Sequence, residues 1–267
     1  MQRSALFDQL LATDIYDLAV IGGGATGLGV ALDAALRGYK VVLLEAHDFA
    51  KGTSSRATKL VHGGVRYLAQ GNLSLVKEAL HERGVLLHNA PHIAQPLAFV
   101  MPSYKWWETA FYGLGLKIYD LLAGKSAIGS TQFLSKEQVL ERLPEVQSTG
   151  LRGGVQYWDG QFDDARLAIE IARTAQTKGA LLLNYCSVEA LLHQNDKLVG
   201  LTCKDKESER IFDVHAKCVI NATGVWVDGI RSMDAHLSGK KIEPLVTPSQ
   251  GVHLVVDRSF LSQDCAL

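Results

Sequence analysis

Three glycines, Gly22, Gly24 and Gly27, fill the pattern GxGxxG within the run Gly22-Gly23-Gly24-Ala25-Thr26-Gly27. In this pattern the first glycine permits a tight turn, the second lets backbone approach a pyrophosphate, and the third lets a helix pack closely on a strand. A helix that begins within the loop directs free N–H groups at phosphate oxygens. The loop therefore indicates a nucleotide site, although a bare glycine triplet occurs in many loops.

The elements around this loop strengthen the interpretation. An apolar run at 16–21 predicts a strand that ends at the glycines, and a helical pattern follows over 28–36 until Gly38. A second short buried strand is predicted at 40–44. Together these elements form a β-α-β unit in about 30 residues, which is the context that the glycine motif requires.

Glu45 ends the second predicted strand, about 20 residues after the loop. A carboxylate at this position accepts hydrogen bonds from ribose hydroxyls and disfavours a 2′-phosphate by charge repulsion. The alternative is a glutamate that simply ends a strand in solvent. Loop and carboxylate together predict an adenine dinucleotide, and they leave open whether it is NAD or FAD.

Downstream, the hydrophobic period changes from helical to alternating. Helices are predicted over 74–89 and from Asp163 or Asp164 to about 178, and the turn pair Asn195-Asp196 marks a hairpin. Short strands are predicted at 180–185, 188–192, 198–204, 211–215 and 218–220. The last of these runs into Ala222-Thr223-Gly224, and we expect it to rejoin the first sheet.

A segment at 52–68 combines small hydroxyl residues, basic residues and a glycine pair. Hydroxyls and N–H groups here can bind a pyrophosphate, and glycines allow backbone to lie near a flavin ring. An NAD domain has no such need, so the segment favours FAD; a basic surface loop is the alternative. Its candidate cofactor residues are Thr53, Ser54, Ser55, Lys59, His62, Gly63 and Gly64.

Composition excludes several classes of function. Lys and Arg number 27 against 28 Asp and Glu, so no global field attracts nucleic acid. The four cysteines show no spacing typical of a metal site, and the amino terminus lacks a secretory signal, so a cytoplasmic location is expected. The aromatic stretch 106–122 is too interrupted to span a bilayer; it predicts an amphipathic helix that packs on the core or lies on a membrane surface.

With these motifs the sequence resembles the FAD-dependent glycerol-3-phosphate dehydrogenases, within the wider group of glutathione-reductase-like flavoproteins. The resemblance covers essentially the whole chain and is most specific over 53–68 and 163–167. It implies an α/β fold with a Rossmann-like FAD-binding domain of the glutathione-reductase type, a β meander and an incomplete antiparallel substrate, or cap, domain. The FAD-binding domain is expected at 1–80 and 150–235 and the substrate domain at 81–149 and 236–267. Relatives continue further, so truncation at the carboxyl end is expected.

The resemblance also implies roles for individual residues. The glycine loop, including Ala25 and Thr26, and Glu45 would hold the ADP half of FAD, and the residues Thr53 to Gly64 named above would line the pyrophosphate and isoalloxazine. A backbone group at Val188 would recognise adenine. Ala222, Thr223 and Gly224 would close over the cofactor. Arg66 and Tyr67 would face the substrate, and His253 would approach the flavin from the substrate domain.

The implied reaction oxidises sn-glycerol 3-phosphate to dihydroxyacetone phosphate, with hydride moving from C2 to flavin N5 while the hydroxyl loses its proton. His253 is a candidate base because an unperturbed histidine titrates at about 6.5; its alternative is a satisfied histidine in a strand at 251–256. Arg66 can grip phosphate through paired N–H donors, or it forms a structural salt bridge.

Relatives of this kind pass electrons to quinone, or to oxygen, and are peripheral membrane enzymes. The resemblance thus implies attachment to the inner face of the cytoplasmic membrane, with 106–122 as a candidate contact, and is compatible with a homodimer. Two other hypotheses stay open. One is a flavoenzyme resembling amino-acid oxidases, where a substrate carboxylate replaces the phosphate; the other is a truncated FAD-binding module without catalysis.

Overall fold

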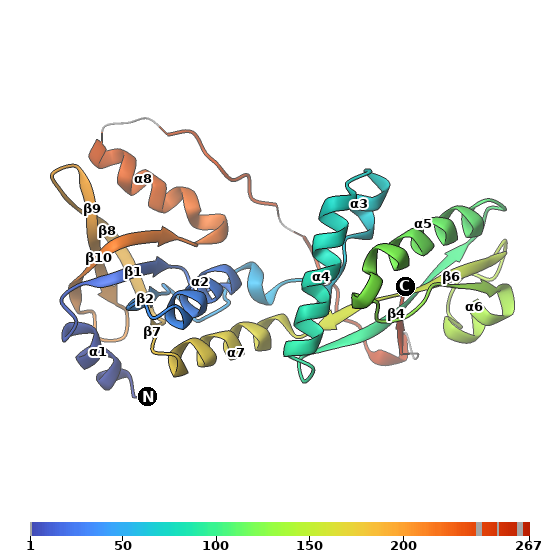
Figure 1. The fold of residues 1–267 in the computed structure, drawn as a ribbon, viewed down its shortest axis with the longest axis horizontal. Coiled ribbons are helices and arrows are strands. Elements are labelled where there is room, and N and C mark those ends of the chain that lie inside the picture. Colours follow the sequence, from blue (N-terminus) through green and yellow to red (C-terminus); the bar gives the residue numbers. More distant parts are fainter. Residues whose placement is uncertain (1, 239–241, 250, 261–263) are drawn as a thin grey trace. The chain divides into compact units, whose positions relative to one another are not determined.

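In a computed structural model, the chain divides into two compact units, each described by itself; the structure describes residues 2–238, 242–249, 251–260 and 264–267. The first unit comprises Met1–Ala57 and Asp164–Gly251, and the second Thr58–Asp163 and Val252–Leu267 (Figure 1). These bounds differ from the predicted domain bounds, chiefly because 58–80 belongs to the second unit. Which unit serves cofactor and which serves substrate stays a prediction.

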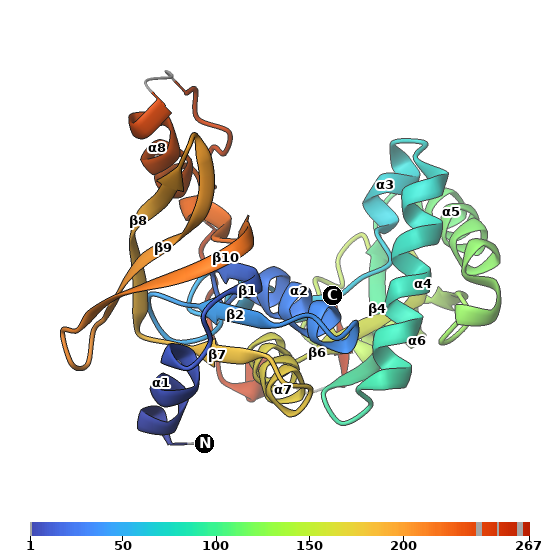
Figure 2. The ribbon, with the colours of Figure 1, turned by 60° about the vertical axis from the view of Figure 1, so that its left-hand side comes forward.

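The first unit contains a six-stranded sheet in the order β7-β2-β1-β10-β9-β8. Four strands run parallel and the other two continue the sheet as an antiparallel meander (Figure 2). The predicted β-α-β unit and the return of the last strand to the first sheet are confirmed. The strands are β1 (Tyr16–Ile21), β2 (Val41–Leu44), β7 (Leu181–Leu183), β8 (Cys186–Gln194), β9 (Lys197–Asp205) and β10 (Ile211–Asn221).

The prediction of separate strands at 211–215 and 218–220 was wrong, because β10 is continuous. Its first half pairs antiparallel with β9, up to His215, and its second half pairs parallel with β1 from Ala216 onward. The backbone of β10 thus changes its hydrogen-bonding partner from β9 to β1 between His215 and Ala216, and the strand continues without interruption. The hairpin turn at Asn195 and Asp196 is confirmed, and both residues have positive φ angles.

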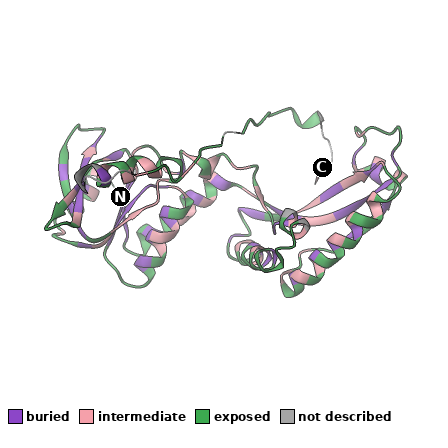
Figure 3. Cartoon of the chain, turned by 90° about the horizontal axis from the view of Figure 1, so that it is seen from above, coloured by how far each residue is buried: buried purple, intermediate pink, exposed green. Residues whose placement is uncertain are grey.

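Side chains of the parallel strands alternate between two apolar layers. On one face, Val20 and Leu43 pack against the predicted helices α2 (Ala25–Leu36) and α7 (Asp164–Thr177). On the other face, Ile21 belongs to a core that includes residues of the meander and of α1 (Arg3–Leu11), a helix that the sequence analysis did not predict. Both faces of the parallel strands are therefore covered, and most residues of β1 and β2 are buried. Figure 3 colours the buried residues of the chain purple.

The second unit is built on a long antiparallel pair, β4 with β6, which runs from Ala94 opposite Phe162 to Ser103 opposite Gly153. Two helices that the sequence predicted, α4 and α5, share an apolar cluster around Leu80. The strands are β3 (Leu60–Val61), β4 (Ala94–Ser103), β5 (Gln132–Ser135), β6 (Gly153–Phe162) and β11 (Cys265–Ala266). The helices are α3 (Val65–Ala69), α4 (Leu73–Asn89), α5 (Glu108–Ala123) and α6 (Lys136–Arg142).

A buried polar cluster lies under the helices of this second unit. Arg83 and Asp159, each only 2% exposed, form an ion pair at 2.9 Å. The Asp159 carboxylate also accepts the Tyr119 hydroxyl at 3.2 Å and the Gly63 N–H at 3.0 Å. Burial, with the neighbouring Asp159 charge, raises the pKa of Tyr119 far above its ordinary value. The cluster therefore holds the backbone of Gly63 in place through its N–H group.

The expected strand at 251–256 is wrong. Val252 and Val255 are exposed, and no described strand pairs with this stretch. A run rich in β-branched residues forms a strand only if a neighbouring strand accepts its hydrogen bonds and its side chains become buried. His253 is consequently an exposed residue of an extended segment.

Candidate dinucleotide-binding site

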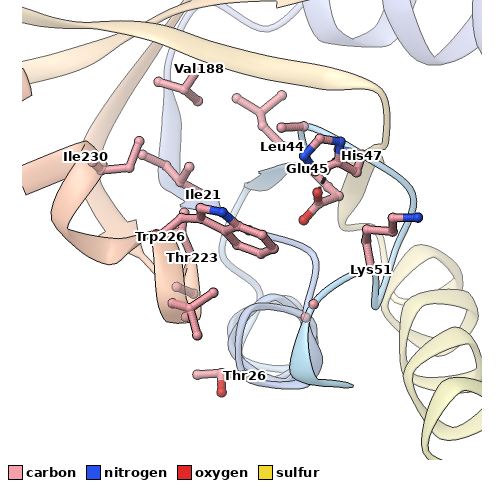
Figure 4. Close-up of a pocket in the computed structure, with 18 of the residues that line it drawn as sticks. Ile21, Thr26, Leu44, Glu45, His47, Lys51, Val188, Thr223, Trp226 and Ile230 are labelled. Atoms are coloured by element: carbon pink, nitrogen blue, oxygen red, sulfur yellow. Dashed lines mark hydrogen bonds between the residues drawn. The ribbon is translucent and has the colours of Figure 1, made fainter. Parts of the chain in front are cut away.

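A cleft of about 440 Å³ opens in the first unit, where the carboxyl ends of β1, β2 and β10 meet (Figure 4). Ile21, Leu44 and Ala222 are among the residues that line it. Backbone hydrogen bonds hold these strand ends together: Gly22 N–H donates to the Leu44 carbonyl and Ala222 N–H to the Ile21 carbonyl. Ligands of open α/β sheets bind at this edge, outside the carboxyl ends of the strands.

The glycine loop is shaped by close backbone contacts. Gly22 has φ +108°, and a Cβ there would lie 2.6 Å from the Ala222 carbonyl oxygen. A Cβ at Gly27 would lie 1.9 Å from the Gly22 carbonyl oxygen. Only glycine fits either position, so the turn and the close helix-strand approach inferred from the motif are present.

The start of helix α2 faces the same cleft. Gly24 precedes the first helical residue, and the Ala25 N–H donates to Ser54 Oγ at 2.8 Å. Helix amino termini leave N–H groups without partners inside the helix, and these attract anionic oxygens. The arrangement thus brings backbone donors and the hydroxyl of Ser54 to one point in the cleft.

The Glu45 carboxylate lies at the end of β2 and lines the cleft (Figure 4). Its Oε2 accepts the Gly23 N–H at 2.6 Å, and its Oε1 accepts the His47 N–H at 2.7 Å. A carboxylate offers about four acceptor sites, so both oxygens can still accept ribose hydroxyls. Two backbone donors therefore hold the Glu45 side chain in one orientation at the edge of the cleft.

The opposite wall comes from the turn after β10. Asn221 Oδ1 accepts the Thr223 hydroxyl at 2.7 Å, and Asn221 Nδ2 donates to the Val227 carbonyl at 2.9 Å. Gly224 has φ +58°, in the left-handed region that favours glycine. These contacts fix the turn Ala222-Thr223-Gly224 beside the glycine loop.

The structure brings many of the predicted cofactor residues into this one cleft. Its lining includes Gly22, Gly24, Ala25, Thr26, Glu45, Thr53, Ser54, Val188, Ala222, Thr223 and Gly224. Gly27 packs beneath the loop, and Ser55 belongs to the same unit without being among these lining residues. The roles of all these residues toward a cofactor stay predictions.

Other predicted site residues belong to the second unit: Lys59, His62, Gly63, Gly64, Arg66, Tyr67 and His253. Lys59 has φ +63°, and Gly64, at φ +76°, precedes helix α3, which carries Arg66 and Tyr67. The Arg66 side chain lies outside the described part of the structure. Their contacts with flavin or substrate remain predictions.

Sequence reasoning missed several lining residues. His47 and Lys51 follow Glu45 in the loop that leaves β2, and Trp226 follows the turn after β10. Their positions could have predicted that they line the cleft, because residues directly after the carboxyl ends of the strands of such a sheet lie where its ligands bind. Cys186, at the start of β8, also lines the cleft and carried no such signal.

This cleft fits the ADP half of a dinucleotide. Its volume falls within the range of about 300–1,000 Å³ that is usual for small-molecule sites. A Cβ at Gly22 or Gly27 would collide with backbone, helix α2 begins at the cleft, and Glu45 lies at the end of β2, where the motif predicts a ribose-binding carboxylate. Fold and site define a dinucleotide-binding protein of the Rossmann type.

Comparison with known proteins narrows this class. The family model "FAD dependent oxidoreductase" matches residues 17–266, so the chain belongs to the family of FAD-dependent oxidoreductases. It is 47% identical to the mitochondrial glycerol-3-phosphate dehydrogenase of Homo sapiens over 278 residues, which cover 99% of this chain and 38% of that protein. The predicted resemblance to the FAD-dependent glycerol-3-phosphate dehydrogenases is confirmed, as is the choice of FAD as the family's cofactor.

Solved structures agree with this assignment. The glycerol-3-phosphate dehydrogenase of Bacillus halodurans, complexed with FAD, is 35% identical and matches with a TM-score of 0.68 over 87% of this chain and 38% of that one. The glycine oxidase of Bacillus cereus, at 24% identity, a TM-score of 0.56 and coverage of 81% and 57%, shares the fold alone. The chain spans about 38% of the length of the human relative.

Proposed function

We propose that this chain binds FAD and belongs to an enzyme that oxidises sn-glycerol 3-phosphate to dihydroxyacetone phosphate. The observation that carries the proposal is the cleft at the carboxyl ends of β1, β2 and β10, with the glycine loop and Glu45 on its walls. The identity to glycerol-3-phosphate dehydrogenases over 99% of the chain supports the choice of substrate. Because the chain spans less than half of that relative, the activity is proposed for the whole protein.

The proposal assigns a separate role in cofactor binding, substrate binding or proton transfer to each of several residues. Backbone N–H groups at the start of α2, with Ser54, bind the pyrophosphate, and Glu45 accepts the ribose hydroxyls. Arg66 binds the substrate phosphate through paired N–H donors, and a ring nitrogen of His253 takes the proton of the C2 hydroxyl. When bound, the flavin supplies the hydride-accepting N5 atom.

The electron acceptor is proposed to be a quinone, or oxygen, with the protein attached peripherally to the inner face of the cytoplasmic membrane. In the part of the chain that the structure describes, no helix is long and apolar enough to cross a bilayer. Helix α5 supports a surface contact, because Phe111, Leu114 and Leu121 are exposed along it, and the exposed Trp106 lies two residues before its start. A homodimer is compatible with the proposal.

The decisive experiment is anaerobic mixing of the FAD-loaded protein with glycerol 3-phosphate while the flavin absorbance is recorded. Bleaching by glycerol 3-phosphate, and not by glycine, is the expected result. Bleaching by amino acids alone would favour the alternative of an amino-acid-oxidase-like enzyme. A flavin that no substrate bleaches in this chain, but that glycerol 3-phosphate bleaches in a version extended to the length of its relatives, would identify a binding module. Failure in the extended version as well would overturn the enzymatic proposal.

A further inference from the structure

Trp226 stands out among the residues that line the cleft. It is the last residue of the short 3₁₀ turn η3 (Gly224–Trp226), and its side chain is 55% exposed although it borders a cavity. The chain has four tryptophans, and Trp226 is the one in the first unit. A large apolar ring left open to solvent inside a cleft indicates a surface that a ligand covers.

The indole reaches across the cleft from one wall to the other. A Cβ added to Gly52, on the loop that leaves β2, would lie 3.1 Å from Trp226 Cζ3. The His47 ring of the same loop has its centroid 6.2 Å from the indole, at an interplanar angle of 52°. Figure 4 shows the indole extending from the Thr223 side of the cleft toward Glu45. The absence of a side chain at Gly52 is what allows this approach.

The neighbours of the indole suit an adenosine diphosphate group. Glu45 can bind ribose hydroxyls, and Lys51 brings a positive charge to the loop opposite the indole. Val188 and Ile230 supply apolar surface to the same cleft. Aromatic side chains bind nucleotides by covering the flat, weakly polar faces of base and sugar, whose oxygens other groups then bind.

We propose that Trp226 is a cofactor-binding residue whose indole covers the adenosine diphosphate half of FAD in this cleft. The inference rests on the proposed binding of FAD and adds a residue to it. It assigns a function to the residue two positions after the turn Ala222-Thr223-Gly224, for which the glycine motif predicts no role.

Tryptophan fluorescence tests the contact directly. ADP is the probe, because it carries the proposed ligand group without a flavin that would itself absorb the emitted light. In the flavin-free full chain, ADP is expected to quench the fluorescence. Quenching should disappear in Trp226→Phe and persist in Trp106→Phe, a matched control that removes an 81% exposed tryptophan of the second unit. Quenching that survives Trp226→Phe would overturn the proposal.

Calorimetry with ADP and with FAD gives the second readout. Trp226→Ala is expected to weaken the binding of ADP and of FAD by about tenfold, the usual consequence of losing one aromatic stacking contact. Trp226→Phe is expected to weaken the binding of both ligands by less. Unchanged or tighter binding by Trp226→Ala would overturn the inference, since the indole would then be irrelevant or an obstacle. If Trp226→Ala does not fold, the fluorescence of Trp226→Phe decides alone. A wild-type chain that binds neither FAD nor ADP would instead overturn the proposed function, and the inference with it.

Discussion

Each unit of this chain holds one distinctive polar cluster, and the two clusters differ in their exposure to solvent. In the first unit, the cluster lines a cleft at the open edge of the sheet and comprises backbone groups, hydroxyls such as that of Ser54, the Glu45 carboxylate and Lys51. In the second unit, a full ion pair, Arg83 with Asp159, is buried beneath helices and binds further donors from Tyr119 and Gly63.

This difference separates two kinds of sensitivity to mutation. The cleft of the first unit depends on the absence of side chains at Gly22 and Gly27, because backbone itself forms its wall. The buried cluster of the second unit depends on the presence of both charges of its ion pair, because a buried charge without its partner has a high desolvation cost. Substitutions at matched positions of the two units can therefore test the comparison.

The largest effect is expected from Asp159→Asn. It leaves the Arg83 guanidinium buried without a counter-charge, which typically costs about 3–5 kcal/mol of unfolding free energy. Urea unfolding followed by circular dichroism measures this loss. The matched control is Asp33→Asn, which breaks the exposed pair of Asp33 with Arg37 in the first unit and should cost about 0–1 kcal/mol. Equal losses in the two variants would show that burial of the pair is not what matters.

The next effect concerns the glycine loop. Gly27→Ala places a Cβ against the Gly22 carbonyl oxygen, a backbone atom that cannot move aside cheaply, so we expect loss of FAD binding and about 1–3 kcal/mol of destabilisation. Gly29→Ala is the control on the same helix, because a Cβ there meets nothing within 4 Å. It should stabilise the helix by about 0.5–1 kcal/mol and leave binding intact. FAD titration and thermal unfolding measure both, and a Gly27→Ala protein that binds FAD normally would contradict the cradle.

The same contrast explains what the sequence could and could not predict. The β-α-β unit with its glycines and Glu45 lies in about 30 consecutive residues, so local pattern and spacing were enough. The return of β10 to β1 could also be predicted, since a short apolar strand that runs into the turn Ala222-Thr223-Gly224 follows the meander. The continuity of β10 could not be predicted, because it depends on a change of pairing partner, from β9 to β1, in the middle of the strand.

In the second unit the decisive contacts join distant residues. Arg83 and Asp159 are 76 positions apart, and neither residue type nor local period indicates that they meet in a core, where charged residues are rare. The prediction of a strand at 251–256 was wrong for a related reason. Its content of valines is a local signal, whereas a strand also needs a partner, and no described strand provides one.

A smaller, pH-dependent effect is expected at Asp205 in the first unit. Burial alone would raise its pKa, but hydrogen bonds from Ser208 and Arg3 outweigh burial and hold the pKa of this carboxyl below its ordinary value. A lowered folded-state pKa stabilises the fold fully above the unfolded value of about 3.9, and this stabilisation is lost as pH falls through the folded-state pKa. Urea unfolding between neutral and acidic pH should therefore show a steeper acid loss in the wild type than in Asp205→Asn. Parallel losses in the two proteins would exclude this role.

The smallest effect on stability is expected on the exposed face of α5 in the second unit. Leu121 is 81% exposed, so Leu121→Lys should change the unfolding free energy by no more than about 0.5 kcal/mol. If this face contacts a membrane, the same change should lower co-sedimentation with lipid vesicles, because a lysine on an interfacial apolar face opposes its insertion. Ile211→Lys, at an exposed apolar position of β10 in the first unit, is the matched control and should leave co-sedimentation unchanged. Equal vesicle binding by the wild type, Leu121→Lys and Ile211→Lys would exclude α5 as the membrane contact.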